Sequence, residues 1–405
     1  MKRIGLVYQN VNLKYLFDEA ESIGYELVLF NPEVSDDFSH KSVLAQESLD
    51  IFSEGAADLL IEKSNNYKLD GLVTIYDRAI PLIAEVNEKL GFVGIPASVA
   101  PNVRSKTLMK KCFTKHGVST AKSFEVDLSK EISLQKIIDE IGPYPFIIKP
   151  SNGYGGDNVV LAYNLEETLA ALEYIARTGN YQSALIEEFI GGTEYIVDSF
   201  SIDRKHHVLS IASKGVPKGP YFEEPYHIAG KVVEAEIVDK VVSEVSKALD
   251  SLGLINGPSH TEIKVFNDNV YIIEIGARIG GEGVCHFLVK ESTGVNFAKL
   301  LLDWAAGVKI EEDLPTNPKP YRYSLNYNIR VNKGGILKSI QGLELLKDRD
   351  NVTDIIVISK KNDEIKPYPD FSGYPGFVHS THQSYSEVED FISYMDRNLI
   401  TEYNQ

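Results

Sequence analysis

The sequence is poor in cysteine and has no long apolar run. Its only two cysteines, Cys112 and Cys285, form no CxxC motif, which excludes a disulfide framework and a cysteine-rich zinc site. No apolar stretch approaches the roughly 18 residues of a membrane span. The first residues read as a strand and lack the basic, apolar and small-residue regions of a secretory signal. We therefore expect a cytoplasmic protein that is not anchored in a membrane.

Positive charge is also scarce. The chain has 41 lysines and arginines against 58 aspartates and glutamates, a net charge of −17 at pH 7. An acidic surface repels nucleic acids and anionic membranes, so neither is an expected partner. Hydrophobic residues make up 43% of the 405 residues, a proportion typical of a globular chain. Its length suits about two to four domains.

Two common nucleotide-binding motifs are missing. No GxGxxG follows the first expected strand, at residues 3–8, which argues against a dinucleotide site. No GxxxxGK[ST] loop occurs anywhere in the chain. Residues 1–101 still alternate strand patterns, at 3–8, 25–30 and 69–75, with helix-length segments. This alternation predicts a small parallel sheet with helices on both faces.

The strand patterns at 259–266 and 270–277 flank a turn and carry Glu262 and Glu274. If the turn has three residues centred on Asp268, the two glutamates lie opposite each other, with Cβ atoms roughly 4.5–5.5 Å apart. Carboxylates at that distance repel unless a cation lies between them, and oxygen ligands suit Mg²⁺. The alternative is a pair of solvated glutamates on an edge hairpin, against which the apolar neighbouring residues argue.

A phosphate-binding pattern follows the strand at 145–149. Lys149 ends this strand, and the next turn contains Gly153, Gly155 and Gly156. Glycines allow backbone N–H groups to approach phosphate oxygens, and the lysine adds a positive charge. A glycine-rich hairpin with a surface lysine is the alternative.

A run of lysines lies in a segment at 102–117 that has a helical apolar stripe. Lys106, near the start of this segment, is a weaker candidate for the same nucleotide site. In a run with Lys110 and Lys111, such a residue is usually part of a solvated helix face.

One strand edge has features that suit a nucleoside. The segment Glu187-Glu188-Phe189-Ile190 offers backbone groups to a nucleobase, and the carboxylate of Glu194 can accept hydrogen bonds from ribose hydroxyls. Plain sheet is the alternative for this segment.

Arg278 lies four residues after Glu274 and opens a run that contains Gly280, Gly281 and Glu282. Arginine pairs bidentately with carboxylate or phosphate, and glycines let a substrate approach the backbone. A structural ion pair is the alternative role for this arginine.

In their order and spacing, these segments resemble the ATP-grasp superfamily along nearly the whole chain. The resemblance implies an α/β fold, α+β in part. It comprises an N-terminal Rossmann-like parallel-sheet domain, a central ATP-binding lid and catalytic core, and a C-terminal β-rich subdomain. We expect the N-terminal domain at 1–101, the ATP-grasp domain at 102–316 with its lid at about 116–190, and the C-terminal subdomain, which completes the catalytic region, at 317–405.

The same resemblance assigns roles to the candidate residues. It implies ATP and Mg²⁺ as cofactors, with Mn²⁺ as an alternative metal and with Glu262 and Glu274 as the metal ligands. It makes Arg278 the catalytic residue that stabilises the reaction centre. ATP contacts are implied for Lys106, Lys149, Gly153, Gly155, Gly156, Glu187, Glu188, Phe189, Ile190 and Glu194.

Within the superfamily, the runs Ser-His-Thr-Glu at 259–262 and Glu-Ile-Gly-Ala-Arg at 274–278 are similar to those of bacterial L-amino acid ligases, which make dipeptides. The similarity implies a carboxylate activated as an acylphosphate, attack by an amine, and release of ADP and phosphate. The partners are then amino acid substrates, and a homodimer is common in the superfamily.

The substrates are expected near four residues, His260, Gly280, Gly281 and Glu282. Glu282 is hypothesised to pair with a cationic group, either the α-amine of a substrate or a basic side chain such as that of arginine. His260 is a candidate general base, and a hydrogen-bonded core histidine is the alternative.

Two positions depart from the family pattern. Gly276 stands where an asparagine often completes the metal shell, and the phosphate loop ends Asp157-Asn158-Val159 rather than Ser-x-Gly-Val. Three other interpretations stay open. The first is a ligase that joins an amino acid to a non-proteinogenic acid or amine. The second is a biotin-dependent carboxylase, against which the Ile-Gly-Gly-Glu run after Arg278 argues. The third is an ATP-binding regulator without turnover.

Overall fold

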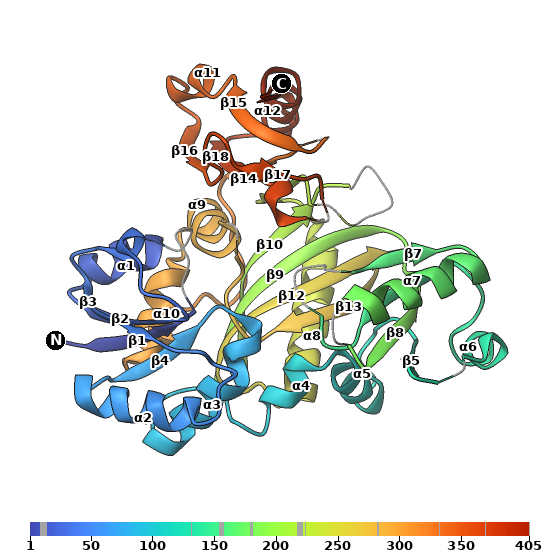
Figure 1. The fold of residues 1–405 in the computed structure, drawn as a ribbon, viewed down its shortest axis with the longest axis horizontal. Coiled ribbons are helices and arrows are strands. Elements are labelled where there is room, and N and C mark those ends of the chain that lie inside the picture. Colours follow the sequence, from blue (N-terminus) through green and yellow to red (C-terminus); the bar gives the residue numbers. More distant parts are fainter. Residues whose placement is uncertain are drawn as a thin grey trace.

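The computed structural model describes residues 1–8, 14–130, 132–153, 158–178, 181–216, 222, 224–281, 283–331, 333–368 and 370–404. The chain has a mixed α/β fold that combines a parallel sheet with larger antiparallel sheets (Figure 1). The expected fold class is therefore confirmed. Among the described residues, no helix has both the length and the apolar character that crossing a bilayer requires.

A four-stranded parallel sheet, in the order β3-β2-β1-β4, forms the N-terminal part. Its elements are β1 (Arg3–Val7), α1 (Lys14–Ser22), β2 (Glu26–Asn31), β3 (Val43–Ser48), α2 (Ala56–Tyr67), β4 (Gly71–Thr74) and α3 (Ile80–Leu90). The predicted parallel sheet is confirmed. Strand β3 was not expected, because it is a partly exposed edge strand whose sequence has no regular apolar alternation.

The N-terminal sheet packs tightly on helix α10 (Phe297–Ala305), so the two form one apolar core. Ile4 and Leu6 on β1 belong to the same buried cluster as Leu301 on the helix. Gly71 lies so close to α10 that a Cβ atom on it would be 1.9 Å from the carbonyl oxygen of Ala305. This close packing fixes where the end of β4 lies relative to the rest of the chain.

The central sheet has eight antiparallel strands in the order β13-β12-β9-β10-β11-β14-β18-β16. They are β9 (Thr193–Ile202), β10 (Lys205–Lys214), β11 (Tyr226–Ala229), β12 (Gly257–Phe266), β13 (Asn269–Gly276), β14 (Tyr323–Ile329), β16 (Val352–Val357) and β18 (Gly376–His382). Helix α8 (Ala235–Leu252) packs on this sheet through the buried stripe Val241, Val245 and Leu249.

A smaller antiparallel sheet, in the order β5-β8-β6-β7, lies at one side of the molecule, in green at the right of Figure 1. Its elements are β5 (Ser123–Asp127), α6 (Leu134–Ile141), β6 (Phe146–Pro150), β7 (Val160–Ala162), α7 (Leu165–Thr178) and β8 (Ser183–Glu188). Its own apolar core contains Phe146, Ile148 and Ile175. This small sheet is therefore a packing unit of its own.

Two helices, α4 (Ala100–Arg104) and α5 (Lys106–Lys115), precede the small sheet. The sequence predicted one continuous helix here, and this prediction was wrong. Ser105 has an extended backbone, and its Oγ accepts a hydrogen bond from the backbone N of Leu108 at 3.3 Å. Ser105 is therefore the N-cap of a second helix, which begins at Lys106.

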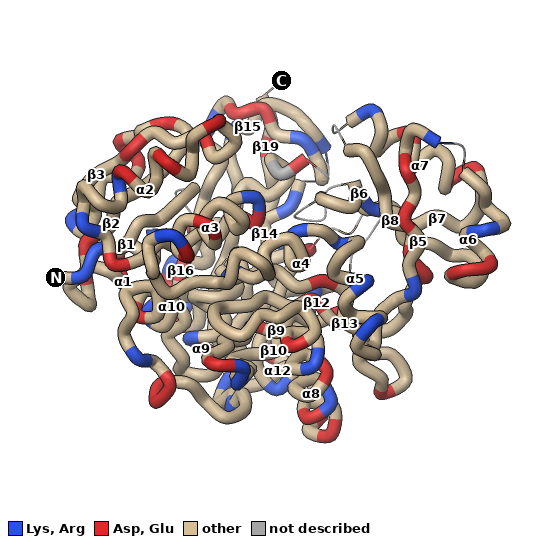
Figure 2. The backbone as a smooth tube through the Cα atoms, turned by 90° about the horizontal axis from the view of Figure 1, so that it is seen from below, with Lys and Arg blue, Asp and Glu red and all other residues tan. Residues whose placement is uncertain are grey.

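The C-terminal residues extend the central sheet through β14, β16 and β18 and add a small sheet in the order β17-β15-β19. The other elements are a π-helical turn at Val284–Val289, α9 (Lys290–Thr293), β15 (Gly335–Gln341), α11 (Glu344–Lys347), β17 (Glu364–Ile365), α12 (Tyr385–Asn398) and β19 (Ile400–Tyr403). Figure 2 shows acidic and basic residues interleaved along the chain, so the negative charge is spread over many elements.

Candidate active site

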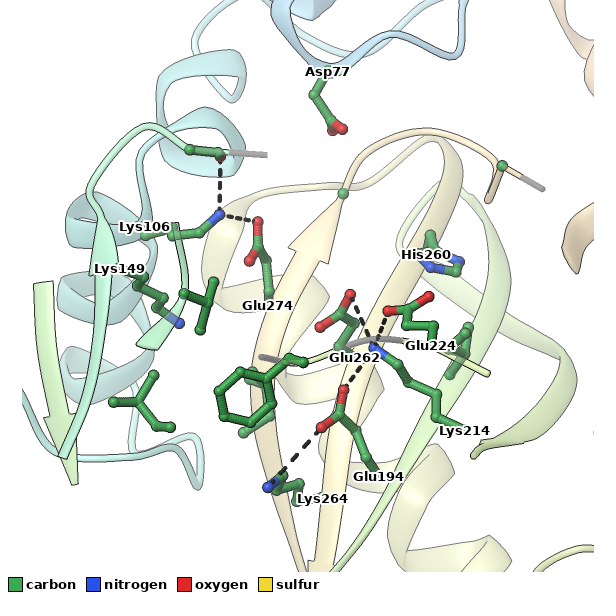
Figure 3. A pocket seen from close by; sticks show the side chains of 18 of the residues that line it. Asp77, Lys106, Lys149, Glu194, Lys214, Glu224, His260, Glu262, Lys264 and Glu274 are labelled. Carbon is green, nitrogen blue, oxygen red and sulfur yellow. Dashed lines mark hydrogen bonds and ion pairs between the residues drawn. The ribbon is translucent and has the colours of Figure 1, made fainter. Parts of the chain in front are cut away.

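A cavity of about 350 Å³ lies where the end of β4, helix α5, the small sheet and strands β9 to β13 meet (Figure 3). Predicted site residues that line it are Lys106, Lys149, Gly153, Glu187, Glu188, Phe189, Ile190, Glu194, His260, Glu262, Glu274, Arg278 and Gly281. The predicted residues Gly155, Gly156 and Glu282, together with Asp157, lie outside the described residues. The structure therefore brings together most of the residues that the sequence singled out.

The two glutamates lie opposite each other, as predicted, but through a different turn. A two-residue turn, Asn267-Asp268, joins β12 to β13, and both residues have positive φ (49° and 58°). This turn alone would shift the register by one residue and separate the pair. A β-bulge at Ile273 restores the alignment, so that Glu262 pairs with Glu274. The expected three-residue turn was therefore wrong.

The charges around this pair fit a bound cation. Both glutamate side chains are 32% exposed and open into the cavity. Desolvation within the protein raises the pKa of Glu262. Lys214, at 3.8 Å, lowers this pKa, but nearby carboxylates raise it further, and the net shift is upward. Glu274 contacts Lys106, and despite desolvation Lys106 and Lys149 lower its pKa to about 2. A divalent cation would relieve the repulsion that raises the pKa of Glu262.

Two lysines share one buried carboxylate at the cavity wall. Glu187 on β8 lies 2.8 Å from the Nζ of Lys149 and 3.1 Å from the Nζ of Lys110. All three side chains are nearly inaccessible to solvent. Lys110 also donates a hydrogen bond to Thr120 Oγ1 at 2.6 Å. The solvated helix face that was the alternative for this run of lysines does not hold for Lys110, although the next residue, Lys111, is 68% exposed.

Replacing Glu187 with glutamine is expected to lower the free energy of unfolding by about 3–5 kcal/mol, because it leaves two buried ammonium groups without their carboxylate. Burial already lowers the pKa of Lys110 to about 8, which marks how poorly solvated this site is. Urea denaturation measures the effect. The double variant Glu187→Gln/Lys110→Met should regain part of the loss, because it removes one of the unpaired cations. A single variant as stable as the unmodified chain would contradict this account.

A further lysine at the cavity, Lys214 on β10, was not predicted, and its side chain is only 9% exposed. Its Nζ lies 2.6 Å from Glu194, 2.5 Å from Glu224 and 3.8 Å from Glu262. These carboxylates outweigh burial and raise the pKa of Lys214 well above its usual value. Glu224 also lies 3.0 Å from Nε2 of His227. The sequence could not indicate this cluster, because its members lie on separate strands and loops and share no spacing.

The predicted nucleobase edge presents an aromatic ring to the cavity. Phe189 is 37% exposed, and the Nζ of Lys264 lies 4.8 Å from its ring centroid. Lys264 also donates to the carbonyl oxygen of Ile190 at 3.0 Å. The backbone N–H of Phe189 is bonded to the carbonyl oxygen of Pro145 at 3.2 Å, so this residue offers its ring rather than its amide. Such a surface suits a flat heterocycle.

His260 is held by a buried carboxylate. Its Nδ1 lies 2.9 Å from Oδ1 of Asp198, which is 2% exposed. A Cβ atom on Gly280 would lie 2.7 Å from the same Nδ1, so the glycine leaves the space that the ring needs. The ring of His260 is therefore hydrogen-bonded and also lines the cavity, and its role as a general base stays a prediction.

Arg278 is paired with an N-terminal residue that the sequence did not indicate. Its Nε donates to Oδ2 of Asp77 at 2.8 Å, and a terminal nitrogen donates to the carbonyl oxygen of Ile279 at 3.0 Å. Despite burial, Asp77 and the more distant Glu274 raise the pKa of Arg278. The guanidinium is thus held as a cation at the wall of the cavity.

These residues fit a magnesium nucleotide. Among the described residues, no group of three histidine, cysteine or acidic side chains could hold a metal by itself. Mg²⁺ is usually bound by only one or two carboxylates and takes its other oxygens from phosphates and water. Glu262 and Glu274 provide the two carboxylates, and Lys106 and Lys149 provide positive charge beside them for phosphate oxygens.

Comparison with known proteins agrees with this arrangement. Residues 142–286 match the ATP-grasp domain model. The chain superposes on an L-amino acid ligase from Bacillus licheniformis with a TM-score of 0.89, at 33% sequence identity, covering 100% of this chain and 99% of that one. An alanine–anticapsin ligase of Bacillus subtilis is 28% identical over 304 residues, 69% of this chain and 63% of that protein. A dapdiamide A synthase of Enterobacter agglomerans is 22% identical over 294 residues, 69% of this chain and 68% of that protein.

The fold, the site and these similarities define an ATP-grasp protein, and the chain belongs to that family. The relatives named above are ligases or synthases. Along its whole length, the chain resembles the L-amino acid ligase of Bacillus licheniformis. The resemblance to such ligases expected from the sequence is therefore confirmed. The match to the alanine–anticapsin ligase spans a little less than two thirds of that protein's length.

Proposed function

We propose that the chain is an ATP-dependent ligase that joins the carboxyl group of one amino acid to the amino group of a second. A carboxylate oxygen attacks the γ-phosphorus of ATP, which gives an acylphosphate and ADP. The amine then attacks the acyl carbon, loses a proton and expels phosphate. The observation that carries the proposal is one cavity that gathers Glu262, Glu274, Lys106, Lys149 and Arg278. Similarity to an L-amino acid ligase along the whole chain supports it.

The nucleotide end of the cavity binds and orients ATP. Glu262 and Glu274 would hold Mg²⁺, with Mn²⁺ as the alternative metal, and the bound metal would neutralise charge on the transferring phosphoryl group. Lys106 and Lys149 bind phosphate oxygens. Phe189 borders the base. Catalysis of phosphoryl transfer depends largely on positioning and electrostatic stabilisation.

Glu194 is proposed to accept hydrogen bonds from the ribose. Its carboxylate is already paired with Lys214, which fixes its orientation in the cavity. A carboxylate held in place by one cation loses little further freedom when it binds a hydroxyl group.

The substrate end stabilises the charge of the acylphosphate. Arg278 stays positive and lies close to the glutamate hairpin, where it can hold the acylphosphate and the oxyanion that forms during amine attack. The small sheet, β5 to β8, is proposed to act as a lid that keeps water from hydrolysing this intermediate.

A second candidate function differs only in the substrates. Similarity to a ligase named for alanine and anticapsin favours a reaction in which one partner is not one of the twenty standard amino acids. The preference for a basic amino acid through Glu282 and the homodimer stay predictions, because neither is tested by the described residues.

A phosphate-release screen tests the proposal. The chain is incubated with ATP, Mg²⁺ and the twenty amino acids, singly and in pairs, and active wells are analysed by mass spectrometry. The proposal expects phosphate, ADP and a product whose mass equals two amino acids minus water. A matched reaction with Lys149→Met should release no phosphate above background. Phosphate release that depends on one amino acid, without a dipeptide, would favour the second candidate. No phosphate in any well, with ATP bound, would contradict the dipeptide proposal.

A further inference from the structure

An aspartate of the N-terminal sheet reaches the proposed catalytic arginine. Asp77 begins a short 3-10 turn, Asp77–Ala79, which two residues separate from the end of β4, and Arg278 follows β13 some 200 residues later in the chain. Oδ2 of Asp77 accepts a hydrogen bond from Nε of Arg278 at 2.8 Å. The side chains are only 16% and 19% exposed, so water screens this ion pair weakly. The N-terminal sheet thus contributes a charged group to a site built mainly by the rest of the chain.

The backbone that carries Asp77 is anchored on both sides. Its preceding neighbour, Tyr76, stacks on Tyr8 at the end of β1, with ring centroids 4.9 Å apart and planes 5° apart. Its following neighbour, Arg78, lies over the ring of Phe52 at 4.1 Å. The close approach of β4 to α10 fixes the strand from which this turn starts. Asp77 is therefore presented by a rigid support, which is what a positioning residue requires.

Gly276 leaves the space in which this pair lies. A Cβ atom at this position would be 3.4 Å from Oδ1 of Asp77 and 3.6 Å from the guanidinium carbon of Arg278. A Cβ atom alone would make only ordinary van der Waals contacts there. The longer side chain of an asparagine would need room beside the ion pair.

We propose that Asp77 is a positioning residue that fixes the guanidinium of Arg278 over Gly276, and that the N-terminal sheet completes the active site through it. The inference rests on the proposed function, because it assumes that Arg278 holds the acylphosphate. Nε is committed to Asp77 and one terminal nitrogen to the carbonyl oxygen of Ile279. The remaining donors are left for the reacting group.

The variant Asp77→Asn tests the proposal in the full-length chain. It keeps the shape of the side chain and removes its charge. We measure kcat with the pair of amino acid substrates that gives the fastest phosphate release. We expect it to fall about 10- to 100-fold, the range set by one lost charge-assisted hydrogen bond. The KM for ATP should stay close to that of the unmodified chain, and the chain should stay folded, because the amide oxygen can still accept a hydrogen bond from Arg278. Asp70→Asn is the matched control, because Asp70 also pairs with a cation, Lys2 at 2.9 Å, but lies outside the cavity.

A double-mutant cycle separates positioning from a general structural effect. If Asp77 acts through Arg278, then Asp77→Asn changes kcat by less than about twofold when Arg278→Ala is already present. The separate variant Gly276→Asn should also lower kcat, because its side chain needs room beside the ion pair. Full additivity of the two losses, or unchanged kcat in Asp77→Asn, would overturn the proposal.

A binding measurement decides the question without turnover. ADP and Mg²⁺ are titrated with and without aluminium fluoride, which mimics the transferring phosphoryl group. Asp77→Asn should bind ADP alone with unchanged affinity. The factor by which aluminium fluoride increases that affinity should be at least about fivefold smaller than in the unmodified chain. An equal gain in the variant and the unmodified chain overturns the proposal. If no amino acid pair releases phosphate, the proposed function fails on its own, and this titration still tests the role of Asp77.

Discussion

The variant Glu274→Gln is expected to lose phosphate release by about 10²- to 10³-fold, because a neutral amide cannot replace a carboxylate that binds the metal. Glu274 lies directly opposite Glu262 across the bulged hairpin and contacts Lys106. The substitution removes one of the two metal ligands and leaves Lys106 without its counter-ion. Phosphate release measures the turnover. Titration of the ADP complex with Mn²⁺, followed by electron paramagnetic resonance, measures metal affinity separately.

Glu47→Gln is the matched control for this experiment. Glu47 is also a partly exposed glutamate that pairs with a lysine, Lys63 at 2.8 Å, but it lies on the N-terminal sheet outside the cavity. It should keep the turnover and the Mn²⁺ affinity of the unmodified chain. Normal Mn²⁺ affinity in Glu274→Gln would contradict the assignment of this carboxylate to the metal.

The second large effect is expected for Arg278→Ala. Its kcat should fall by about 10²- to 10³-fold, since removing a donor that stabilises developing negative charge has effects of this size. The affinity for ADP should change little, because the nucleotide is bound by Lys106 and Lys149. Arg278→Lys should not restore the rate. An ammonium group carries its donors on one nitrogen, so it cannot reproduce a guanidinium that bonds Asp77 and Ile279 through two nitrogens and presents others to the substrate.

Arg322→Ala is the control for the arginine experiment. Arg322 pairs with Glu291 through its side chain and also donates to the carbonyl oxygen of Glu291 at 2.7 Å, a combination similar to that of Arg278. It lies outside the cavity, so its loss should affect stability more than kcat. If Arg278→Ala weakens ADP binding as much as it lowers kcat, Arg278 binds the nucleotide and not the acylphosphate.

The hairpin glutamates could be predicted from the sequence because local pairing decides where they lie. The register followed from alternation and turn position over only 18 residues, from 259 to 276. The predicted pair was right although the turn was not, because the bulge at Ile273 compensates for the shorter turn. A bulge of this kind leaves no mark in the apolar pattern, so the sequence could not reveal it.

The rest of the site depends on contacts between distant segments. A solvated helix face was the alternative for Lys106, because three lysines in six residues usually mark an exposed face. Only Lys111 among them is largely exposed, since Glu187 and Thr120 supply partners for Lys110 from other elements. Lys214 and Asp77 were not predicted for the same reason, because their partners come from distant segments of the chain. Each is an ordinary charged residue until the fold brings its partner beside it.

Transfer of ¹⁸O from substrate to phosphate tests the central claim, the acylphosphate, most directly. The first amino acid is labelled with ¹⁸O in both carboxylate oxygens, and the phosphate and dipeptide are analysed by mass spectrometry. In the proposed reaction, one labelled oxygen leaves with phosphate and the other remains in the new peptide bond. Phosphate with one ¹⁸O atom and ADP as the nucleotide product would support the claim. Unlabelled phosphate, or AMP in place of ADP, would contradict it.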